Sequence, residues 1–228
     1  MIVKRLCDVA LSFCALVVLS PLLIPVVIIL KVTGEHYIFY VQERIGLGGR
    51  PFGLLKFATM LKDSPKMGTG DITVRNDPRV LPFGRILRKT KINELPQLIN
   101  VLKGDMSLIG PRPVTRKHFD CYNERVKTAI SRMRPGLSGV GSLMFRNEET
   151  LIANSGLPPA ECYQWHIAPY KGELEAWYAG HRSLGFDLLL ILLTIWVVLF
   201  PRSRRYARLL RDLPQPESAV LSATFASM

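Results

Sequence analysis

The chain has 228 residues, with 30 Lys and Arg against 18 Asp and Glu, a formal net charge of +12, and 48% hydrophobic residues. A disordered basic tail would be poorer in apolar residues, and a soluble nucleic-acid binder is rarely this apolar, so both classes are disfavoured. The composition favours a protein that puts apolar segments against a bilayer and presents Lys and Arg to lipid headgroups or phosphorylated substrates. The four cysteines form no CxxC pair, which favours a reducing, cytoplasmic setting.

Residues 1–33 contain an apolar run from Val9 to Leu30. A straight helix of this length would measure about 33 Å and could cross a hydrocarbon core of about 30 Å. Ser20 and Pro21 lie at its centre, and Pro25 follows one turn later. Because each proline removes a backbone donor and clashes with the preceding turn, we expect the helix to break there.

Basic residues flank this run on both sides, with Lys4 and Arg5 before it and Lys31 after it. Both flanks should therefore prefer the cytoplasm. We expect a re-entrant helix-break-helix that dips into one leaflet, and a proline-kinked helix that crosses the bilayer is the open alternative.

A second apolar run extends from Leu184 to Phe200 and precedes a basic cluster, Arg202, Arg204, Arg205, Arg208 and Arg211. At about 17 residues it is marginal for a membrane span. We expect residues 184–211 to form an interfacial or membrane-associated helix with a basic end, although a span stays possible on length. Residues 212–228 are rich in small, polar and proline residues and should form a flexible tail.

Residues 34–183 form the expected central domain between the two apolar runs. The stretch 37–60 reads as a β-hairpin, with strand-forming residues on both sides of the turn sequence Gly46–Pro51. The glycines in this turn match neither GxGxxG nor a Walker A motif, so a plain turn is preferred over a phosphate loop.

A helix is expected over about 94–103, because Leu95, Leu98, Ile99 and Leu102 recur at helical spacing and Gly104 follows. Asn93 is then a natural N-cap, with Glu94 in the first turn. A basic run from Arg79 to Lys91 precedes them, so the helix start could hold phosphate, or a metal between carboxylate and phosphate. A purely structural cap remains the alternative.

Arg112 stands between Pro111 and Pro113, which restrict its backbone. A rigid arginine suits bidentate binding of an oxyanion. A structural turn in which Arg112 pairs with Asp105 explains the same residues.

Taken in order, these features resemble the bacterial sugar transferases, the small monotopic phosphoglycosyl transferases. The resemblance runs from about residue 3 to 205 and is most specific over 93–113. Its residues are Lys4, Arg5, Asp8, Ser20, Pro21, Gln42–Arg44, Lys56, Phe57, Thr59, Met60, Asn93–Leu98, Asn100–Ser107, Gly110–Pro113, Arg134–Gly136, Arg146 and Asn147.

The resemblance implies a mainly helical α+β, membrane-associated monotopic domain with a re-entrant helix, a small β-hairpin and interfacial amphipathic helices. It implies an enzyme at the cytoplasmic face of the bacterial inner membrane, with residues 34–183 as its cytoplasmic catalytic domain. Such an enzyme moves a sugar-1-phosphate from a nucleotide sugar, usually a UDP-sugar, to undecaprenyl phosphate with Mg²⁺. Such a step initiates an exopolysaccharide, capsule or O-antigen repeat. The implied partners are the nucleotide sugar, undecaprenyl phosphate and lipid headgroups, with no nucleic acid.

By the same resemblance, Glu94 would help to hold Mg²⁺. The substrate-binding residues of the polar pocket would be Lys56, Arg88, Arg112, Arg146 and Glu175, the last of these at a position that is usually Asp.

Asn93 departs from the family pattern, which places a nucleophilic Asp at this position. An amide is a far poorer nucleophile than a carboxylate. Three explanations are open. Another carboxylate, with Glu94 nearest, could act as the nucleophile. The chain could bind substrate as an inactive scaffold, or the lipid phosphate could attack the nucleotide sugar directly. Residues 138–170 are the expected determinant of sugar choice.

Overall fold

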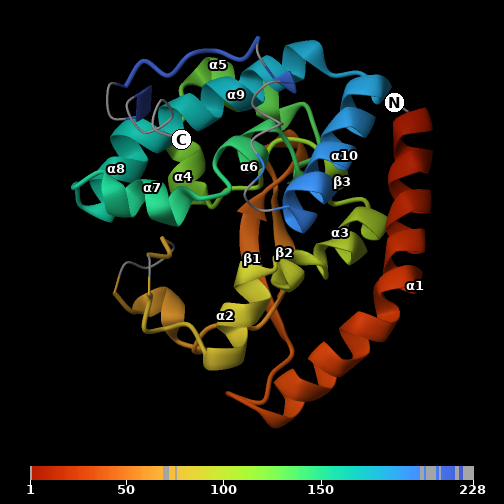
Figure 1. The fold of residues 1–228 in the computed structure, drawn as a ribbon. Helices are drawn as coiled ribbons and strands as arrows, with labels where there is room; N and C mark the ends of the chain where they lie inside the picture. The colour runs from red at the N-terminus through yellow and green to blue at the C-terminus, as the bar shows by residue number, and fades with distance from the viewer. Residues whose placement is uncertain are drawn as a thin grey trace.

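The computed structural model describes residues 2–68, 72–74, 76–200, 203, 209–210, 212–218 and 221–222. Over these ranges the fold is mainly helical with two small sheets, as expected (Figure 1). The helices are α1 (Ile2–Val32), α2 (Pro82–Lys89), α3 (Gln97–Lys103), α4 (Arg116–Asp120), α5 (Glu124–Ser131), α6 (Val140–Met144), α7 (Glu148–Asn154), α8 (Pro159–Cys162), α9 (Ala168–His181) and α10 (Leu184–Leu199). The strands are β1 (Phe39–Ile45), β2 (Pro51–Phe57), β3 (Ser107–Ile109) and β4 (Gly136–Ser138).

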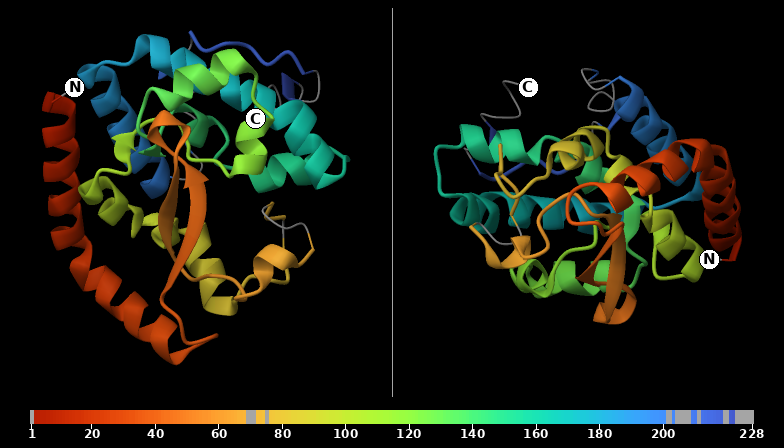
Figure 2. Two further views of the ribbon diagram at one scale, coloured as in Figure 1. Left: turned by 180° about the vertical axis from the view of Figure 1, so that it is seen from behind. Right: turned by 90° about the horizontal axis from the view of Figure 1, so that it is seen from below.

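The helix α1 is continuous through Pro21 and Pro25, so the expected break in the helix is wrong. The helix is bent instead, and it curves around one side of the molecule (Figures 1 and 2). Proline costs a helix one hydrogen bond and adds a steric clash, which bends a long helix without ending it. The Oγ of Ser20 donates to the carbonyl of Val17 at 2.8 Å, so this side chain returns to its own helix.

The first turns of α1 are held by polar contacts to the rest of the protein. Asp8 is 6% exposed, and its carboxylate accepts hydrogen bonds from the Oγ of Ser107 at 2.7 Å and the backbone N–H of Leu108 at 3.1 Å. The guanidinium of Arg5 donates to the carbonyl of Val101 at 2.7 Å, in the last turn of α3, where carbonyls lack intrahelical partners.

Lys4 extends this attachment to α10. Its Nζ lies 2.5 Å from the carboxylate of Asp187, which also accepts a hydrogen bond from the Oη of Tyr178 at 2.6 Å. The basic residues that the sequence placed beside the membrane therefore make specific contacts within the fold.

The other end of α1 packs on the same domain. Val26 and Leu30 are buried against Phe57 of β2 and Leu87 of α2. Between its two ends, α1 exposes large apolar side chains to the outside, and it is long and apolar enough to cross a membrane by length and composition.

The predicted hairpin is confirmed. β1 and β2 pair antiparallel from Phe39 opposite Phe57 to Ile45 opposite Pro51. The turn uses Gly48 and Gly49 at φ 72° and 70°, a conformation that glycine adopts without strain.

A second, parallel pair was not predicted: β3 lies beside β4, with Ser107 opposite Gly136 and Ile109 opposite Ser138. The backbones approach so closely that a Cβ on Gly136 would lie 2.2 Å from the backbone nitrogen of Gly110. This approach places the segment after β3, which carries Arg112, beside the start of β4.

The main core joins α4–α10, and residues near the C-terminus complete it. Leu213 and Leu221 are buried, and the Oη of Tyr170 donates to the carbonyl of Pro214 at 2.9 Å. The described part of the expected flexible tail, 212–228, is therefore packed, because these leucines add apolar area to the core. The predicted basic cluster after residue 201 lies outside the described residues.

We predict that Asp8→Ala lowers the free energy of unfolding by about 2 kcal/mol, because Ser107 and Leu108 would lose a buried charged acceptor. For a chain of this size, the melting temperature should fall by about 5 °C. Cys7→Ala, one position away on an exposed site, is the matched control. Equal melting temperatures for the two variants in the same detergent would contradict the anchoring role of Asp8.

Candidate active site

A large open cleft of about 910 Å³ lies between the hairpin, α2, α3 and the α6–α9 region. It brings together side chains that are far apart in the sequence. The predicted site residues that line it are Lys56, Arg88, Asn93, Glu94, Arg112 and Arg146. Glu175, Ser20 and Pro21 are not among the lining residues; Glu175 lies behind the wall of the cleft.

The start of α3 differs from the prediction. A 3₁₀ turn over Ile92–Glu94 comes first, and α3 begins at Gln97. Asn93 does not cap the helix, because i→i+3 bonds, such as Leu95 N–H to the carbonyl of Ile92 at 3.1 Å, already satisfy the local amides. The helix ends as predicted, with Gly104 at φ 97°.

Glu94 and Arg112 form the central ion pair of the cleft, with Oε1 and Nη2 3.0 Å apart. Burial alone would raise the pKa of Glu94, but the charges of Arg112, Lys56 and Lys91 outweigh it and hold the pKa well below its usual range. The structural alternative in which Arg112 pairs with Asp105 is wrong.

Lys56 lies on β2 at the other side of this pair. Burial, together with the nearby charge of Arg44, lowers its pKa to about 7. A bound polyanion would favour the charged ammonium form of Lys56.

Arg112 is fixed from its backbone as well as its side chain. Its N–H donates to the Oε1 of Glu175 at 3.1 Å, and Glu175 is 2% exposed. Gly141 makes room for this carboxyl group, because a Cβ there would lie 2.4 Å from Oε1. Burial raises the pKa of Glu175 to about 7. Glu175 is thus a supporting residue rather than a residue of the cleft surface.

The sequence reasoning missed a second ion pair in the cleft. The Oε2 of Glu148 accepts from the Nζ of Lys171 at 2.5 Å, and Lys171 also lies over the rings of Phe145 and Tyr163 at 5.3 and 5.7 Å. Lys171 and Glu175 are four residues apart on α9 and so share a helix face. Because Glu175 was a predicted site residue, this spacing is the sequence signal that could have pointed to Lys171.

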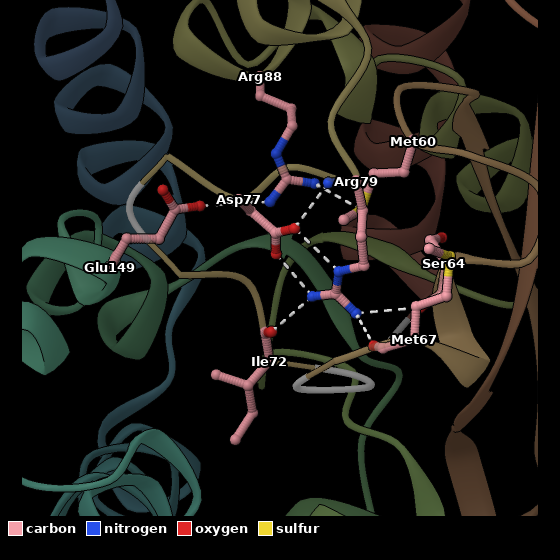
Figure 3. A network of polar contacts seen from close by, with 8 residues as sticks. All are labelled: Met60, Ser64, Met67, Ile72, Asp77, Arg79, Arg88 and Glu149. Atoms are coloured by element: carbon pink, nitrogen blue, oxygen red, sulfur yellow. Dashed lines mark hydrogen bonds and ion pairs between the residues drawn. The ribbon is translucent and has the colours of Figure 1, made fainter.

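Arg79, in the predicted basic run, is a structural residue. It is 4% exposed, and Figure 3 shows its guanidinium bound to Asp77 and to backbone carbonyls, which include that of Ser64 at 3.0 Å and that of Met67 at 2.8 Å. This network fixes the segment between β2 and α2 that forms one side of the cleft. In the same view, Arg88 of α2 pairs with Glu149 of α7 at 3.2 Å.

The donors near Glu94 fit the expected Mg²⁺. The Oδ1 of Asn93 is buried without a hydrogen-bond partner, and Asn93 and Glu94 both line the cleft. Mg²⁺ in phosphate sites takes one or two protein oxygens and completes its shell with substrate phosphates and water. Within the described ranges, no group of three or more His, Cys, Asp or Glu residues could hold a metal alone, so the fit requires substrate oxygens.

A family model described as bacterial sugar transferase matches residues 1–201. The "UDP-glucose:undecaprenyl-phosphate glucose-1-phosphate transferase" of Caulobacter vibrioides is 36% identical over 84% of this chain and 68% of its own length. The "Exopolysaccharide production protein ExoY" of Sinorhizobium fredii is 34% identical over 87% of this chain and 86% of its own length. The chain matches 41% of the length of an "Uncharacterized sugar transferase" of Haemophilus influenzae, at 32% identity.

We predict that the stability of the protein falls as pH rises from about 4.5 to 7, in part through Glu175. The folded protein holds a proton on this carboxyl in that window, whereas the unfolded chain has lost it. Glu175→Gln keeps an acceptor for the N–H of Arg112 but cannot ionise. It should therefore remove about 3 kcal/mol of the pH-dependent loss.

The check is the melting temperature of both proteins at pH 5 and pH 8. Wild type should lose more stability than Glu175→Gln over this interval. Parallel pH profiles would contradict a buried, neutral Glu175.

Proposed function

The chain belongs to the bacterial sugar transferase family, and we propose that it transfers a sugar-1-phosphate from a UDP-sugar to undecaprenyl phosphate, releasing UMP. The observation that carries this proposal is the cationic cleft around the Glu94–Arg112 pair. The product would be the first lipid-linked intermediate of an exopolysaccharide, capsule or O-antigen repeat.

Each cation has a role in this reaction. Arg112, fixed by Glu175 through its backbone and by Glu94 through its side chain, presents a preoriented guanidinium to a phosphate oxygen. Lys56, Arg88 and Arg146 line the same cleft and can neutralise further charge of the diphosphate. Because these groups are in place before substrate arrives, little reorganisation is needed when charge develops at the reacting phosphorus.

Glu94 would hold Mg²⁺ together with substrate phosphate oxygens, and the unpaired Oδ1 of Asn93 is a further oxygen in the lining of the same cleft. A bound Mg²⁺ would neutralise charge on the diphosphate and make UMP a better leaving group.

The proposed site lies at the cytoplasmic face of the inner membrane, with α1 re-entrant. Both ends of α1 contact the same domain, the first through Asp8 and the second through Val26 and Leu30. Attachment of both ends to the same domain supports a helix whose second end stays on the side of the membrane that holds this domain. The exposed apolar side chains between these ends suit a helix that enters one leaflet only.

The cleft reaches from its charged centre to the apolar helices. Ala15 and Leu19 of α1 and Ile195 and Val198 of α10 are among its lining residues. A polyprenyl chain could follow this wall while its phosphate meets the cations. The exposed side of α10, with Leu184, Leu188, Leu192, Ile195 and Leu199 at helical spacing, favours a helix that lies at the interface.

We predict that both ends of α1 face the cytoplasm. In a background with Cys7, Cys14 and Cys121 replaced by serine, Val3→Cys and Lys31→Cys place single labels at exposed sites near the two ends. A membrane-impermeant maleimide should label neither in spheroplasts and both in inverted vesicles. Labelling of the two sites from opposite sides would show that α1 crosses the bilayer.

We predict that Arg112→Lys lowers kcat/KM for UMP release by about 10²-fold, because an ammonium cannot reproduce a planar guanidinium bound on one side to Glu94. The assay contains the detergent-purified chain, Mg²⁺, undecaprenyl phosphate and a panel of UDP-sugars. Arg125→Lys is the matched control, since Arg125 is exposed and pairs with Glu173 outside the cleft. Absence of UMP release by wild type with every donor would refute the proposed function.

A further inference from the structure

Asn93 occupies the centre of the cleft in a state that suits binding rather than attack. The residue is 6% exposed and lines the cleft, and its Oδ1 has no hydrogen-bond partner. A carboxamide carries no negative charge and cannot be converted into a carboxylate-like nucleophile by a neighbouring base. Its Nδ2 can donate to a phosphate oxygen, and its Oδ1 can accept from a hydroxyl or a bound water.

The carboxylates that line the cleft are all engaged in ion pairs, within the part of the chain that the structure describes. Their pairs are Asp77 with Arg79 at 2.6 Å, Glu94 with Arg112 at 3.0 Å, Glu148 with Lys171 at 2.5 Å and Glu149 with Arg88 at 3.2 Å. Glu94 is the next residue after Asn93, and its carboxylate is held by the guanidinium of Arg112 at 3.0 Å. A carboxylate paired in this way with a guanidinium is a poor nucleophile.

Ser142 and His118, two other side chains that line the cleft, are also poorly activated. The Oγ of Ser142 lies 3.5 Å from the Nη1 of Arg112, and a cation cannot remove the hydroxyl proton. His118 is 8% exposed, and its ring packs 4.2 Å from the ring of Tyr163. Neither of these two side chains is therefore placed to replace a missing nucleophile at position 93.

The cleft instead offers both a polar and an apolar surface. Its volume of about 910 Å³ lies near the upper end of the range for small-molecule sites, roughly 300–1,000 Å³. It joins the cations around Arg112 to the apolar wall formed by Leu19 and Ile195. The phosphate of a lipid held along that wall can reach the same cations as the diphosphate of a soluble donor.

We propose that this chain transfers the sugar phosphate directly, in a ternary complex, without a covalent enzyme adduct. The inference rests on the proposed function. A phosphate oxygen of the lipid attacks the β-phosphorus of the UDP-sugar and forms the new P–O bond. The bond from the β-phosphorus to the oxygen that bridges to the α-phosphorus breaks, and its electron pair leaves on UMP. The lipid diphosphate sugar is the other product, and Asn93 binds and positions a phosphate oxygen.

The test uses the full chain in lipid nanodiscs with UDP-sugar labelled at the β-phosphate. Without undecaprenyl phosphate, wild type should release no burst of UMP and gain no sugar-phosphate mass in intact mass spectrometry. With the lipid, UMP and labelled lipid should form in equal amounts, and initial-velocity plots should intersect, as for a sequential mechanism. Parallel plots with a burst and a mass increase would overturn the inference and leave the proposed function standing.

Variants at position 93 make the test independent of detection limits. Asn93→Asp restores a carboxylate and should gain the adduct mass that wild type lacks, which shows that an adduct would be detected. Asn93→Ala should lose roughly tenfold in kcat/KM, as expected for one lost hydrogen bond, whereas removal of an essential nucleophile costs roughly 10⁴-fold or more. Equal melting temperatures establish that the variants are folded.

An adduct on Glu94 or on any other residue of wild type would overturn direct transfer. Failure of wild type to form lipid product with every UDP-sugar would overturn the proposed function and the inference together.

Discussion

The Glu94–Arg112 ion pair is the interaction around which the cleft is built. Arg112 is fixed at its N–H by the buried carboxyl of Glu175, and its side chain is fixed by Glu94 at 3.0 Å. The close approach of Gly110 to Gly136 brings the arginine-bearing segment to this place, and Gly141 leaves room for Glu175. Small residues and a buried acid thus support one cation, which is the arrangement that a preoriented phosphate site needs.

The anchoring of α1 connects this site to the membrane. Asp8 and Arg5 bind the segments at the two ends of the α3–β3 connection, near Val101 and Leu108. The helix that provides the exposed apolar surface is therefore attached to α3, which follows Glu94 in the chain, and to β3, which precedes Arg112. This arrangement explains how a soluble nucleotide sugar and a lipid phosphate could meet in one cleft without either leaving its own phase.

Local patterns predicted the parts of the fold that depend on local physics. The hairpin followed from strand-forming residues around Gly46–Pro51, and the end of α3 followed from Gly104. The start of α3 was misplaced, because the 3₁₀ turn that contains Asn93 has no distinct pattern. The three-residue strands β3 and β4 are too short for periodicity to reveal. The site cations were predicted from the family resemblance, but their ion pairs were not. The Glu148–Lys171 contact joins residues 23 apart, and the sequence around either residue gives no sign of the other.

Asn93 is the residue that most restricts the chemistry of the cleft, since a neutral side chain lies among cations and paired carboxylates. Direct transfer from donor to lipid follows from this neutral side chain.

The stereochemical course at the β-phosphorus tests this account most directly. With a UDP-sugar that carries a chiral phosphorothioate at the β-position, a single in-line displacement inverts configuration, whereas two successive displacements retain it. The account predicts inversion in the lipid-linked product of the wild-type chain, and retention would contradict it.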